Sequence, residues 1–443
     1  MQFKSTVPSS SPDSAAPLVS FKDAVLQCLP PEGGLYVPSE VMDMRQFFLY
    51  MDASTTYPEL VETLTPVLLQ GDLNPVSATL LAQSAFSFEP ELVQLDERFS
   101  LLKLYNGPTG LFKDFGTGFL AAAMEEFLKN NGHSMILSAV RDDTGVSIAR
   151  AFARRLNIVC CLLYPSGPIR GLDLSTFLPN GGNILPIQIR GTFDDCQRLI
   201  TECIYDTSFA ERYHITTANA RNPGRLLPQS FYYIYAFLKL KKQLPGGLIF
   251  SVPSGNFGNL IAGLYAWKFG LPVGGFIAAM NANNSVGDFI QGKPFKPKQP
   301  VATISPGLDV AVPSNYERLS SFYAEAPAVM RNMVFPASID DKTTVDTIGK
   351  VWKKYGVLLD PHAAVGFAAA ERMIEERNLS SCEAHIVVLA TGHPAIESGL
   401  IKEITGQTIK MPEHLLALRK RTDSIAIIDP RLEALESAIA SCV

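Results

Sequence analysis

The pattern of hydrophobic and polar positions changes near residue 92. Before it, apolar residues recur with a helical period in 41–50 and 60–69, and the turn signals PPEGGLYVP and QGDLNP bound these segments. After it, short apolar runs alternate with helical patterns, as in a parallel sheet built from βαβ units. The pattern therefore predicts a small, mostly helical N-terminal region followed by α/β structure.

The second part of the chain is predicted to form two open, mostly parallel α/β domains with a cleft between them. The predicted strands are 134–140, 158–163, 247–252, 274–280 and 384–390. The predicted helices are 119–128, 146–156, 231–242, 259–269, 345–355, 363–377 and a terminal Arg/Glu-rich helix. We expect an N-terminal domain in 1–95, a smaller α/β domain in 96–215 and a larger one in 216–443.

Composition and charge narrow the possible functions. Of the 443 residues, 47% are apolar and 18% charged, which is typical of a globular protein with large buried sheets. The formal net charge is −5, and the only basic cluster, QGKPFKPKQP at 291–300, is interrupted by prolines and is predicted to be a solvated loop. Nucleic-acid binding is therefore excluded as the expected function.

The cysteines and the N-terminal residues indicate in which cellular compartment the protein is expected. The seven cysteines include no CxxC pair, and Cys160 and Cys161 stand side by side in an apolar run, where they would point to opposite faces of a strand. Such cysteines are usually small buried hydrophobes, so we expect neither disulfides nor a metal site. The polar start lacks an apolar signal region, and no apolar run approaches the length of about 18 residues that a membrane span needs. We expect a cytoplasmic protein without a membrane partner.

The first candidate for chemistry is GPTGLFKDF, residues 107–115. It places Lys113 between Phe112 and Asp114, after a Gly-Pro turn signal and before an apolar helix-like run. A desolvated lysine has a lowered pKa and can form a Schiff base with a carbonyl cofactor such as pyridoxal phosphate. On these nine residues alone, an ordinary loop lysine with its head in water is the simpler interpretation.

The second candidate is PSGNFGN, residues 253–259, which falls between a predicted strand and a predicted helix. A Gly-rich turn in this position presents free backbone N–H groups and the positive end of the helix dipole to an anion, as a phosphate site requires. The alternative is that Gly255 and Gly258 only permit a tight turn. No GxGxxG follows a strand and no GKS or GKT occurs, so neither a Rossmann nor a P-loop motif is present.

Two further loops follow predicted strands. In LATGHPA, residues 389–395, the hydroxyl of Thr391 can meet the ring nitrogen of a cofactor lying across the sheet, whereas His393 is better interpreted as a structural histidine. In VRDDTG, residues 140–145, Asp143 or Thr144 can bind a ligand or can cap the helix that follows.

In this order and at these separations, the motifs resemble threonine synthase, a pyridoxal-phosphate enzyme of the tryptophan synthase β-like fold type. The resemblance covers nearly the whole chain. It extends through VSFKDAVLQ, GGLYVP, GPTGLFKDF, the DTG loop, LYPSG, GGN, FDDCQ, TTANARNPGRLLPQ, PSGNFGN, LDPHAAVGF and ATGHPA.

The resemblance implies that Lys113 carries the cofactor as a Schiff base and that Thr391 faces the pyridine nitrogen. It implies that the cofactor phosphate is held by Ser254, Gly255, Asn256, Phe257, Gly258 and Asn259. Substrate contacts are expected from Arg141, Asp143, Thr144, Asn219 and Arg225. The implied reaction converts O-phospho-L-homoserine and water to L-threonine and phosphate, with Lys113 as the general base once substrate has displaced it. The expected partner is a small phosphorylated amino acid, and the expected state is a monomer or a homodimer.

The chain also departs from the family's motifs. Arg141 and Asp142 replace the Ser and Gly of S-G-D-T-G, and Pro168 and Ile396 stand where the family has lysines. N-S-I-N becomes Asn219-Ala220-Arg221-Asn222, and the Glu and His that precede G-P-T become Lys103 and Asn106. These departures leave two alternatives to threonine synthesis: a phospho-lyase with an altered substrate, or a weakly active or inactive homologue that acts through binding.

Overall fold

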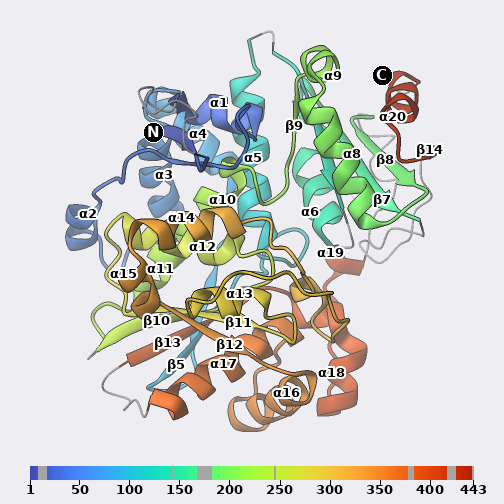
Figure 1. The fold of residues 1–443 in the computed structure, drawn as a ribbon. Coiled ribbons are helices and arrows are strands. Elements are labelled where there is room, and N and C mark those ends of the chain that lie inside the picture. The colour runs from blue at the N-terminus through green and yellow to red at the C-terminus, as the bar shows by residue number, and fades with distance from the viewer. Residues whose placement is uncertain are drawn as a thin grey trace.

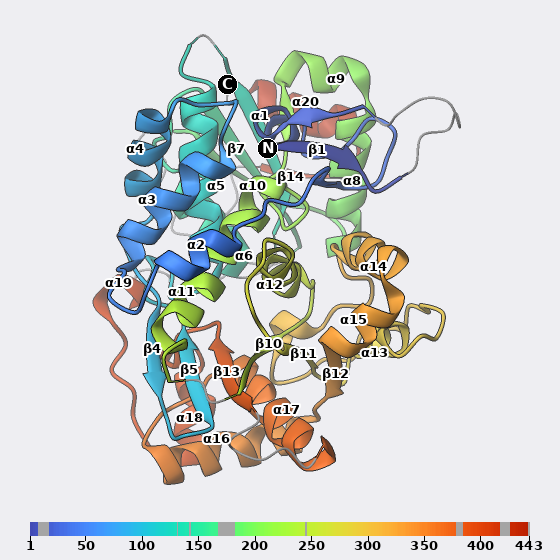
Figure 2. The same cartoon turned by 90° about the vertical axis from the view of Figure 1, so that its left-hand side faces the viewer.

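The structure is a computed structural model, and it describes residues 1–7, 17–130, 132–140, 143–166, 182–243, 246–377, 384–416 and 426–441. Figure 1 shows the larger sheet in the lower part of the molecule, the smaller sheet at the upper right and the N-terminal region at the upper left. The same arrangement is visible after a quarter turn in Figure 2.

The N-terminal region combines helices with a small antiparallel sheet of order β2-β1-β3. Its elements are β1 (Gln2–Ser5), β2 (Val19–Ser20), α1 (Phe21–Gln27), β3 (Tyr36–Pro38), α2 (Arg45–Tyr50), α3 (Tyr57–Leu68) and α4 (Pro75–Ala85). Helix α3 begins with a capping box, in which Thr56 and Glu59 satisfy each other's backbone N–H groups, and it buries Leu60 and Leu64. These strands were not predicted, because they have only two to four residues each and pair with segments that do not follow directly in the chain.

The larger sheet has the order β12-β11-β10-β13-β5-β4, and all its strand pairs are parallel except β4 with β5. Its strands are β4 (Glu91–Gln94), β5 (Phe99–Lys103), β10 (Gly247–Pro253), β11 (Gly275–Met280), β12 (Val334–Ser338) and β13 (Ala384–Ala390). The helices of this part are α10 (Pro223–Leu226), α11 (Ser230–Leu240), α12 (Gly258–Lys268), α13 (Ser285–Ile290), α14 (Tyr316–Glu325), α15 (Pro327–Met333), α16 (Asp341–Tyr355), α17 (Pro361–Arg377), α18 (Ser398–Thr405) and α19 (Glu413–Leu416). Three short 3₁₀ helices lie at Leu227–Gln229, Pro306–Leu308 and Pro394–Glu397.

The smaller sheet is parallel and has the order β14-β8-β7-β6-β9. Its strands are β6 (Ser134–Ala139), β7 (Ile158–Pro165), β8 (Ile184–Ile189), β9 (Ile215–Thr216) and β14 (Ala426–Ile428). The helices around it are α5 (Lys113–Phe127), α6 (Asp143–Phe152), α8 (Phe193–Tyr205), α9 (Thr207–Tyr213) and α20 (Leu432–Ala440).

Each sheet is covered on both faces, which explains why its strands are continuous apolar runs. Helices α16 and α17 pack on the outer face of the larger sheet and form one hydrophobic core with it. Helices α8 and α20 pack on the outer face of the smaller sheet and form a second core. The largest core joins the inner faces of both sheets to the N-terminal helices. Cys160 and Cys161 are both buried and belong to different cores, as the prediction of opposite strand faces requires.

The sheets differ from the expected domain ranges at three places, the first being β4, which lies in 1–95 but pairs with β5 in the larger sheet. Strand β5 lies in 96–215 but belongs to the larger sheet, and β14 lies in 216–443 but joins the edge of the smaller sheet. The chain thus crosses between the two sheets three times, between β5 and β6, between β9 and β10, and between β13 and β14. The segment that carries Lys113 lies on the first of these crossings.

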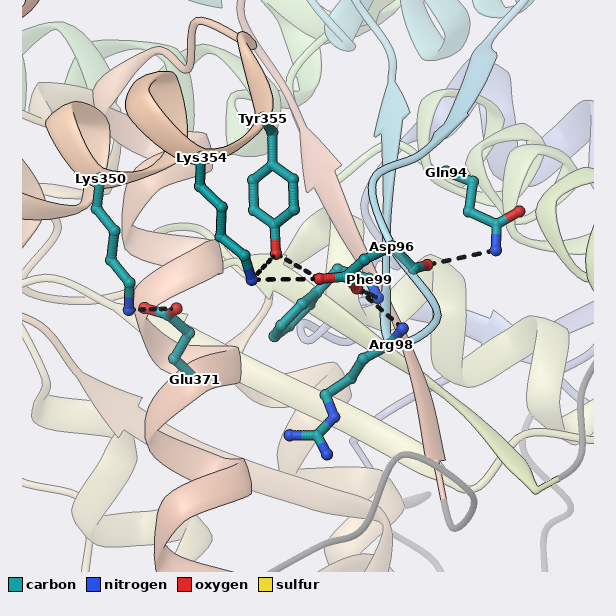
Figure 3. Close-up of polar contacts among 8 residues, drawn as sticks. All are labelled: Gln94, Asp96, Arg98, Phe99, Lys350, Lys354, Tyr355 and Glu371. Carbon is teal, nitrogen blue, oxygen red and sulfur yellow. Dashed lines mark hydrogen bonds and ion pairs between the residues drawn. The ribbon is translucent and has the colours of Figure 1, made fainter.

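A polar network closes the amino end of the larger sheet (Figure 3). One oxygen of Asp96 accepts bonds from the N–H groups of Arg98 and Phe99, at 2.9 and 2.8 Å. The other accepts from the Tyr355 hydroxyl at 2.5 Å and from Lys354 Nζ at 3.4 Å. Asp96 therefore ties the β4–β5 turn to the end of α16.

Candidate active site

Three adjacent strands of the larger sheet end at the predicted motifs. Strand β13 lies between β5 and β10, and all three run parallel, so their carboxyl ends meet at one edge of the sheet. The Lys113 segment follows β5, Thr391 follows β13, and the Ser254–Asn259 turn follows β10. Ligands of open α/β sheets bind at this edge, so the fold brings the three predicted cofactor motifs together in this order.

The Lys113 segment is bonded directly to the Thr391 loop. Phe112 N donates to Thr391 O at 2.9 Å, and His393 N donates to Gly110 O at 2.8 Å. Lys113 is the first residue of α5 and is half-buried. Thr391 is buried, and within the described residues its hydroxyl donates to no acceptor. The backbone thus fixes the distance between the lysine and the hydroxyl predicted to face the ring nitrogen.

Asp114 holds the segment from beneath, and the sequence analysis gave it no role. It is 4% exposed, and its carboxylate accepts bonds from Thr109 N at 2.7 Å, Thr109 Oγ1 at 2.6 Å and Ser147 Oγ at 2.9 Å. Burial raises the pKa of Asp114, although these bonds and the charge of Lys113 oppose the shift. A Cβ on Gly107 would lie 2.6 Å from an Asp114 oxygen, so this turn requires glycine. Through Ser147 the carboxylate also fixes α6 beside the lysine.

The β10–α12 turn has the features of an anion site. Within the described chain, the backbone N–H groups from Gly255 to Asn259 have no acceptor, because they belong to the turn and the first helical residues. Phe257 has a left-handed backbone, with φ of 61°, which places the turn ahead of the helix N-terminus. A Cβ on Gly255 would lie 2.7 Å from Gly307 O, so the turn has no room for a side chain there. Ser254 Oγ donates to Val252 O at 2.7 Å and stabilises the strand end.

The two asparagines of the turn have different surroundings. Asn259 is buried, and its Oδ1 accepts bonds from the hydroxyls of Tyr232 and Tyr233 at 2.6 and 2.7 Å. Its Nδ2 is buried without an acceptor in the described structure, as expected of a donor reserved for a ligand. Asn256 is exposed, and its Oδ1 accepts from Ser314 N at 3.1 Å. Within the described residues, the site thus offers backbone N–H groups without acceptors, a turn that has room only for glycine at position 255, and the unpaired Nδ2 of Asn259. These features fit the phosphate of pyridoxal phosphate.

A second layer supports the turn from the side of α17. His362 Nδ1 lies 2.7 Å from an Asp360 oxygen, and Gly307 N donates to His362 Nε2 at 3.1 Å. Asp360 is buried, and its oxygen would lie 3.1 Å from a Cβ on Gly392. The pair therefore positions both the loop packed on Gly255 and the loop that carries Thr391.

The predicted substrate residues are distributed unevenly. Thr144 lies half-buried in the first turn of α6. Asp143 is the first residue of this helix, but the structure does not describe the side chain of Asp143. Arg141 and Asp142 lie outside the described residues. Asn219 Oδ1 accepts from Arg221 N at 2.8 Å in a local turn. Substrate contacts by these residues stay predictions.

Arg225 is buried, and the contact it makes is structural. Its Nη1 donates to Ala218 O at 2.8 Å, whereas its Nε has no acceptor in the described structure. Burial lowers the pKa of Arg225 to about 10, against the nearby charge of Asp114. Arg225 thus fixes the loop behind Asn219, and its predicted contact with substrate stays a prediction.

The family departures fall in different places. Lys103 pairs with Glu91 at 3.1 Å, and Asn106 Nδ2 donates to Glu89 O at 3.2 Å, so both contact β4 or the residues before it. His393 Nδ1 accepts from Ala395 N at 3.1 Å and so caps the short helix that follows, and burial lowers the pKa of His393. Pro168 lies outside the described residues.

The chain matches three protein-family models. A model described as pyridoxal-phosphate dependent enzyme covers residues 91–392, the threonine synthase N-terminus model covers 9–82, and the threonine synthase C-terminal model covers 363–439. The first match includes all three strand ends described above.

Relatives and solved structures agree with these matches. The chain is 34% identical to the threonine synthase of Serratia marcescens over 404 residues, which is 90% of this chain and 91% of the relative. It is 33% identical to the threonine synthase of Escherichia coli K12 over 400 residues, which is again 90% of this chain and 91% of the relative. The crystal structure of the Escherichia coli enzyme matches with a TM-score of 0.85 at 30% identity, covering 100% of both chains. A pyridoxal-phosphate-bound threonine synthase from Brucella melitensis matches with a TM-score of 0.86 at 27% identity, covering 100% of this chain and 99% of the other.

The fold is therefore that of the pyridoxal-phosphate-dependent enzymes of the tryptophan synthase β-like type. Within this class, the chain belongs to the threonine synthase family. Among the described helices, none combines the length and the apolar character of a membrane span.

Proposed function

We propose that the protein converts O-phospho-L-homoserine and water to L-threonine and inorganic phosphate. The observation that supports this function is the order of Lys113, Thr391 and the β10–α12 turn along three adjacent strand ends. Bound pyridoxal phosphate supplies an electron sink, and the protein supplies orientation and proton transfer.

The residues have separate tasks in this proposal. Lys113 binds the cofactor covalently and, after release, moves protons at the carbons beside it. Thr391 meets the ring nitrogen. The N–H groups of Gly255 to Asn259 and the Asn259 amide bind the phosphate, each charge-assisted bond contributing about 1.5–3 kcal/mol. Asp114 orients the segment that carries the lysine.

The substrate side supports a second candidate. Arg141 and Asp142 replace a neutral Ser-Gly pair, and Ile396 stands where the family has a lysine. A substrate carboxylate beside Asp142 would be repelled, whereas Arg141 attracts an additional acidic group. The second candidate is therefore a phospho-lyase that eliminates phosphate from a related amino-acid phosphate and forms no threonine.

One assay separates the two candidates. The purified protein is incubated with O-phosphohomoserine, O-phosphothreonine or O-phosphoserine, and inorganic phosphate and amino-acid products are measured. Phosphate and threonine in equal amounts from O-phosphohomoserine support the proposal. Phosphate with ammonia and a 2-oxo acid supports the second candidate, and apoprotein without added cofactor controls for contaminating phosphatase. No phosphate from any of the three would contradict both.

The substitutions in the loop provide a second test. Restoring Ser at position 141 and Gly at 142 should raise turnover of O-phosphohomoserine if the loop has changed substrate. If wild type already turns over at about 1 per second or more and the double variant gains nothing, the second candidate is wrong. The expected monomer or homodimer stays a prediction, which the molecular mass in solution checks.

A further inference from the structure

Arg318 is a fully buried cation whose hydrogen-bond acceptors are all uncharged. It is 0% exposed, and it projects from α14 into the core. Its Nε donates to Tyr36 O at 3.0 Å and its Nη2 to Arg221 O at 2.6 Å. Its Nη1 donates to Asn315 Oδ1 at 2.7 Å and to Ala220 O at 3.3 Å. The three nitrogens of the guanidinium, which form a planar fork, thus join the N-terminal strand β3, the 219–222 loop and α14.

The groups around this guanidinium do not neutralise it. Burial raises the pKa of Cys28 to about 12, above the opposing effect of Arg318, so the thiol stays protonated at neutral pH. Burial likewise raises the pKa of Tyr265. Glu317 is exposed, where water screens its charge. The chain therefore holds an uncompensated positive charge here. This arrangement is unfavourable, because burying a cation without an anion costs free energy.

Arg318 lies one side chain behind the β10–α12 turn. Asn315, whose Oδ1 accepts from Arg318 Nη1, has its Nδ2 3.4 Å from the position that a Cβ on Gly258 would take, and this Nδ2 donates to Ala220 O at 3.1 Å. Ala220 Cβ lies 3.5 Å from the same position. The neighbouring Ser314 N binds Asn256. The turn, the 219–222 loop and the 314–318 segment therefore meet at one point.

We propose that Arg318 is a positioning residue that stabilises a phosphate bound in the β10–α12 turn and, through the same fork, holds the 219–222 loop against that turn. The phosphate supplies the anion that the buried guanidinium lacks. The amide dipole of Asn315 is aligned between the two charges, because its Oδ1 faces the cation while its Nδ2 lies on the side of the turn. The inference rests on the proposed function only in taking pyridoxal phosphate as the natural occupant. It couples cofactor binding to the position of Asn219.

The test measures phosphate affinity separately from folding. Pyridoxal phosphate is titrated into the apoprotein, and the melting temperature of the apoprotein is recorded with and without inorganic phosphate. Arg318→Met should raise the Kd for the cofactor about tenfold or more and abolish stabilisation by inorganic phosphate. Arg318→Lys, which keeps the charge, should bind the cofactor more tightly than Arg318→Met does.

A second variant avoids the risk that Arg318→Met fails to fold. Asn315→Asp places a carboxylate between the guanidinium and the turn, so the cation gains a charged partner that offsets the lost Nδ2 bond to Ala220 O, and the apoprotein should still fold. The Kd for the cofactor should rise about tenfold or more, since the charge is neutralised and the new anion repels phosphate. Because the new anion repels phosphate whatever the role of Arg318, the rise supports the inference only together with a raised Kd in Arg318→Met or, if that variant does not fold, with a smaller rise in Arg318→Lys.

Two matched controls distinguish the charge from packing. Lys239 is a partly buried cation on α11 that, like Arg318, donates to backbone oxygens, here those of Ala53 and Thr55 in the N-terminal region at 2.8 and 2.9 Å. Lys239→Met should lower the melting temperature and leave the Kd within about twofold. Tyr265→Phe, next to Arg318, removes a buried hydroxyl without an acceptor in the described structure and should change neither quantity.

The outcomes separate this inference from the proposed function. Wild-type cofactor affinity in both Arg318→Met and Asn315→Asp overturns the inference. A wild-type protein that binds inorganic phosphate but no pyridoxal phosphate contradicts the proposed function, and loss of that phosphate binding in Arg318→Met still supports the inference.

Discussion

The two ends of the larger sheet differ in how completely their polar groups are hydrogen-bonded. At the amino end, Asp96 accepts four bonds, and His385 lies 2.9 Å from Ser100 Oγ and 3.0 Å from Glu97 O. At the carboxyl end, the N–H groups after β10 and the Asn259 amide have no acceptor within the described residues. Of the groups named here, only those at the carboxyl end have donors left for a ligand in the described structure.

This difference separates stability from function within one sheet. Buried donors without acceptors are unfavourable by about 1–3 kcal/mol each, and a ligand that accepts from them removes this cost on binding. Satisfied groups at the other end connect secondary structure elements. Changes at the carboxyl end should therefore alter ligand affinity, and changes at the amino end should alter stability alone.

The largest effect is expected at Lys113. Lys113→Ala removes the group that binds the cofactor covalently, so borohydride reduction should fix no cofactor to the protein, and turnover should fall by about 10³-fold or more. Peptide mass spectrometry of the reduced wild type locates the attachment. Lys103→Ala, which removes the lysine paired with Glu91, should retain both properties. Attachment at another residue in wild type would contradict the assignment of Lys113.

The next effect distinguishes the two glycines of the turn. A Cβ on Gly255 would lie 2.7 Å from Gly307 O and 2.9 Å from Leu308 Cα, whereas the nearest atom to a Cβ on Gly258 is 3.4 Å away. Gly255→Ala should raise the Kd for pyridoxal phosphate about tenfold or more, and Gly258→Ala should change it by about twofold or less. Titration of the apoproteins measures both. Equal Kd values for the two variants would show that close packing at Gly255 does not shape the site.

A smaller effect is expected at the amino end. Burial raises the pKa of Asp96, but the bonds from Tyr355 and from the N–H groups of Arg98 and Phe99 outweigh it and hold the pKa below its ordinary value. Because the folded-state pKa is the lower one, Asp96 stabilises the fold above its unfolded pKa of about 3.9, and this contribution is lost as the pH falls through the folded value.

Asp96→Ala should therefore lower the free energy of unfolding at pH 7 by about 1–2 kcal/mol, and the difference from wild type should shrink below about pH 4. Urea unfolding at several pH values measures this, and the Kd for the cofactor should be unchanged. A variant that loses cofactor affinity without losing stability would reverse the contrast between the two ends.

The smallest effect is expected at a neighbouring surface ion pair. Lys350 Nζ lies 2.6 Å from Glu371 Oε1, with the lysine side chain 58% exposed (Figure 3). Exposed pairs of this kind contribute about 0–1 kcal/mol, so Lys350→Ala should shift the urea midpoint far less than Asp96→Ala. A larger shift than at Asp96 would show that the network around Asp96 does not dominate this end.

Local patterns predicted what depends on local sequence. The buried strands β6, β7, β10, β11 and β13 are apolar runs whose positions were predicted, whereas β5, β8 and β12 were not. Thr391 and PSGNFGN were recognisable because each follows a predicted strand, and Lys113 because it follows a Gly-Pro turn signal. The structure confirms helix 41–50 only from Arg45 onward, since the preceding residues form a loop.

Contacts between distant segments could not be predicted in this way. Nothing near Asn259 indicates that Tyr232 and Tyr233 will bind its oxygen, and nothing near Arg318 indicates Tyr36 and Ala220 as partners. Asp114 was visible next to Lys113, but its bond to Ser147 depends on how α6 packs on α5. The part of the site that orients the ligand-binding groups is thus the part that sequence patterns leave undetermined.

Strand β14 has a consequence for the order of folding. It pairs with β8, although every element from α8 to α19 lies between them along the chain. During synthesis the hydrogen-bonding edge of β8 therefore stays open until nearly the whole chain has left the ribosome, and pairing at such separation is slow. An open strand edge is also where chains associate wrongly. Until β14 pairs with it, β8 is therefore exposed to such association.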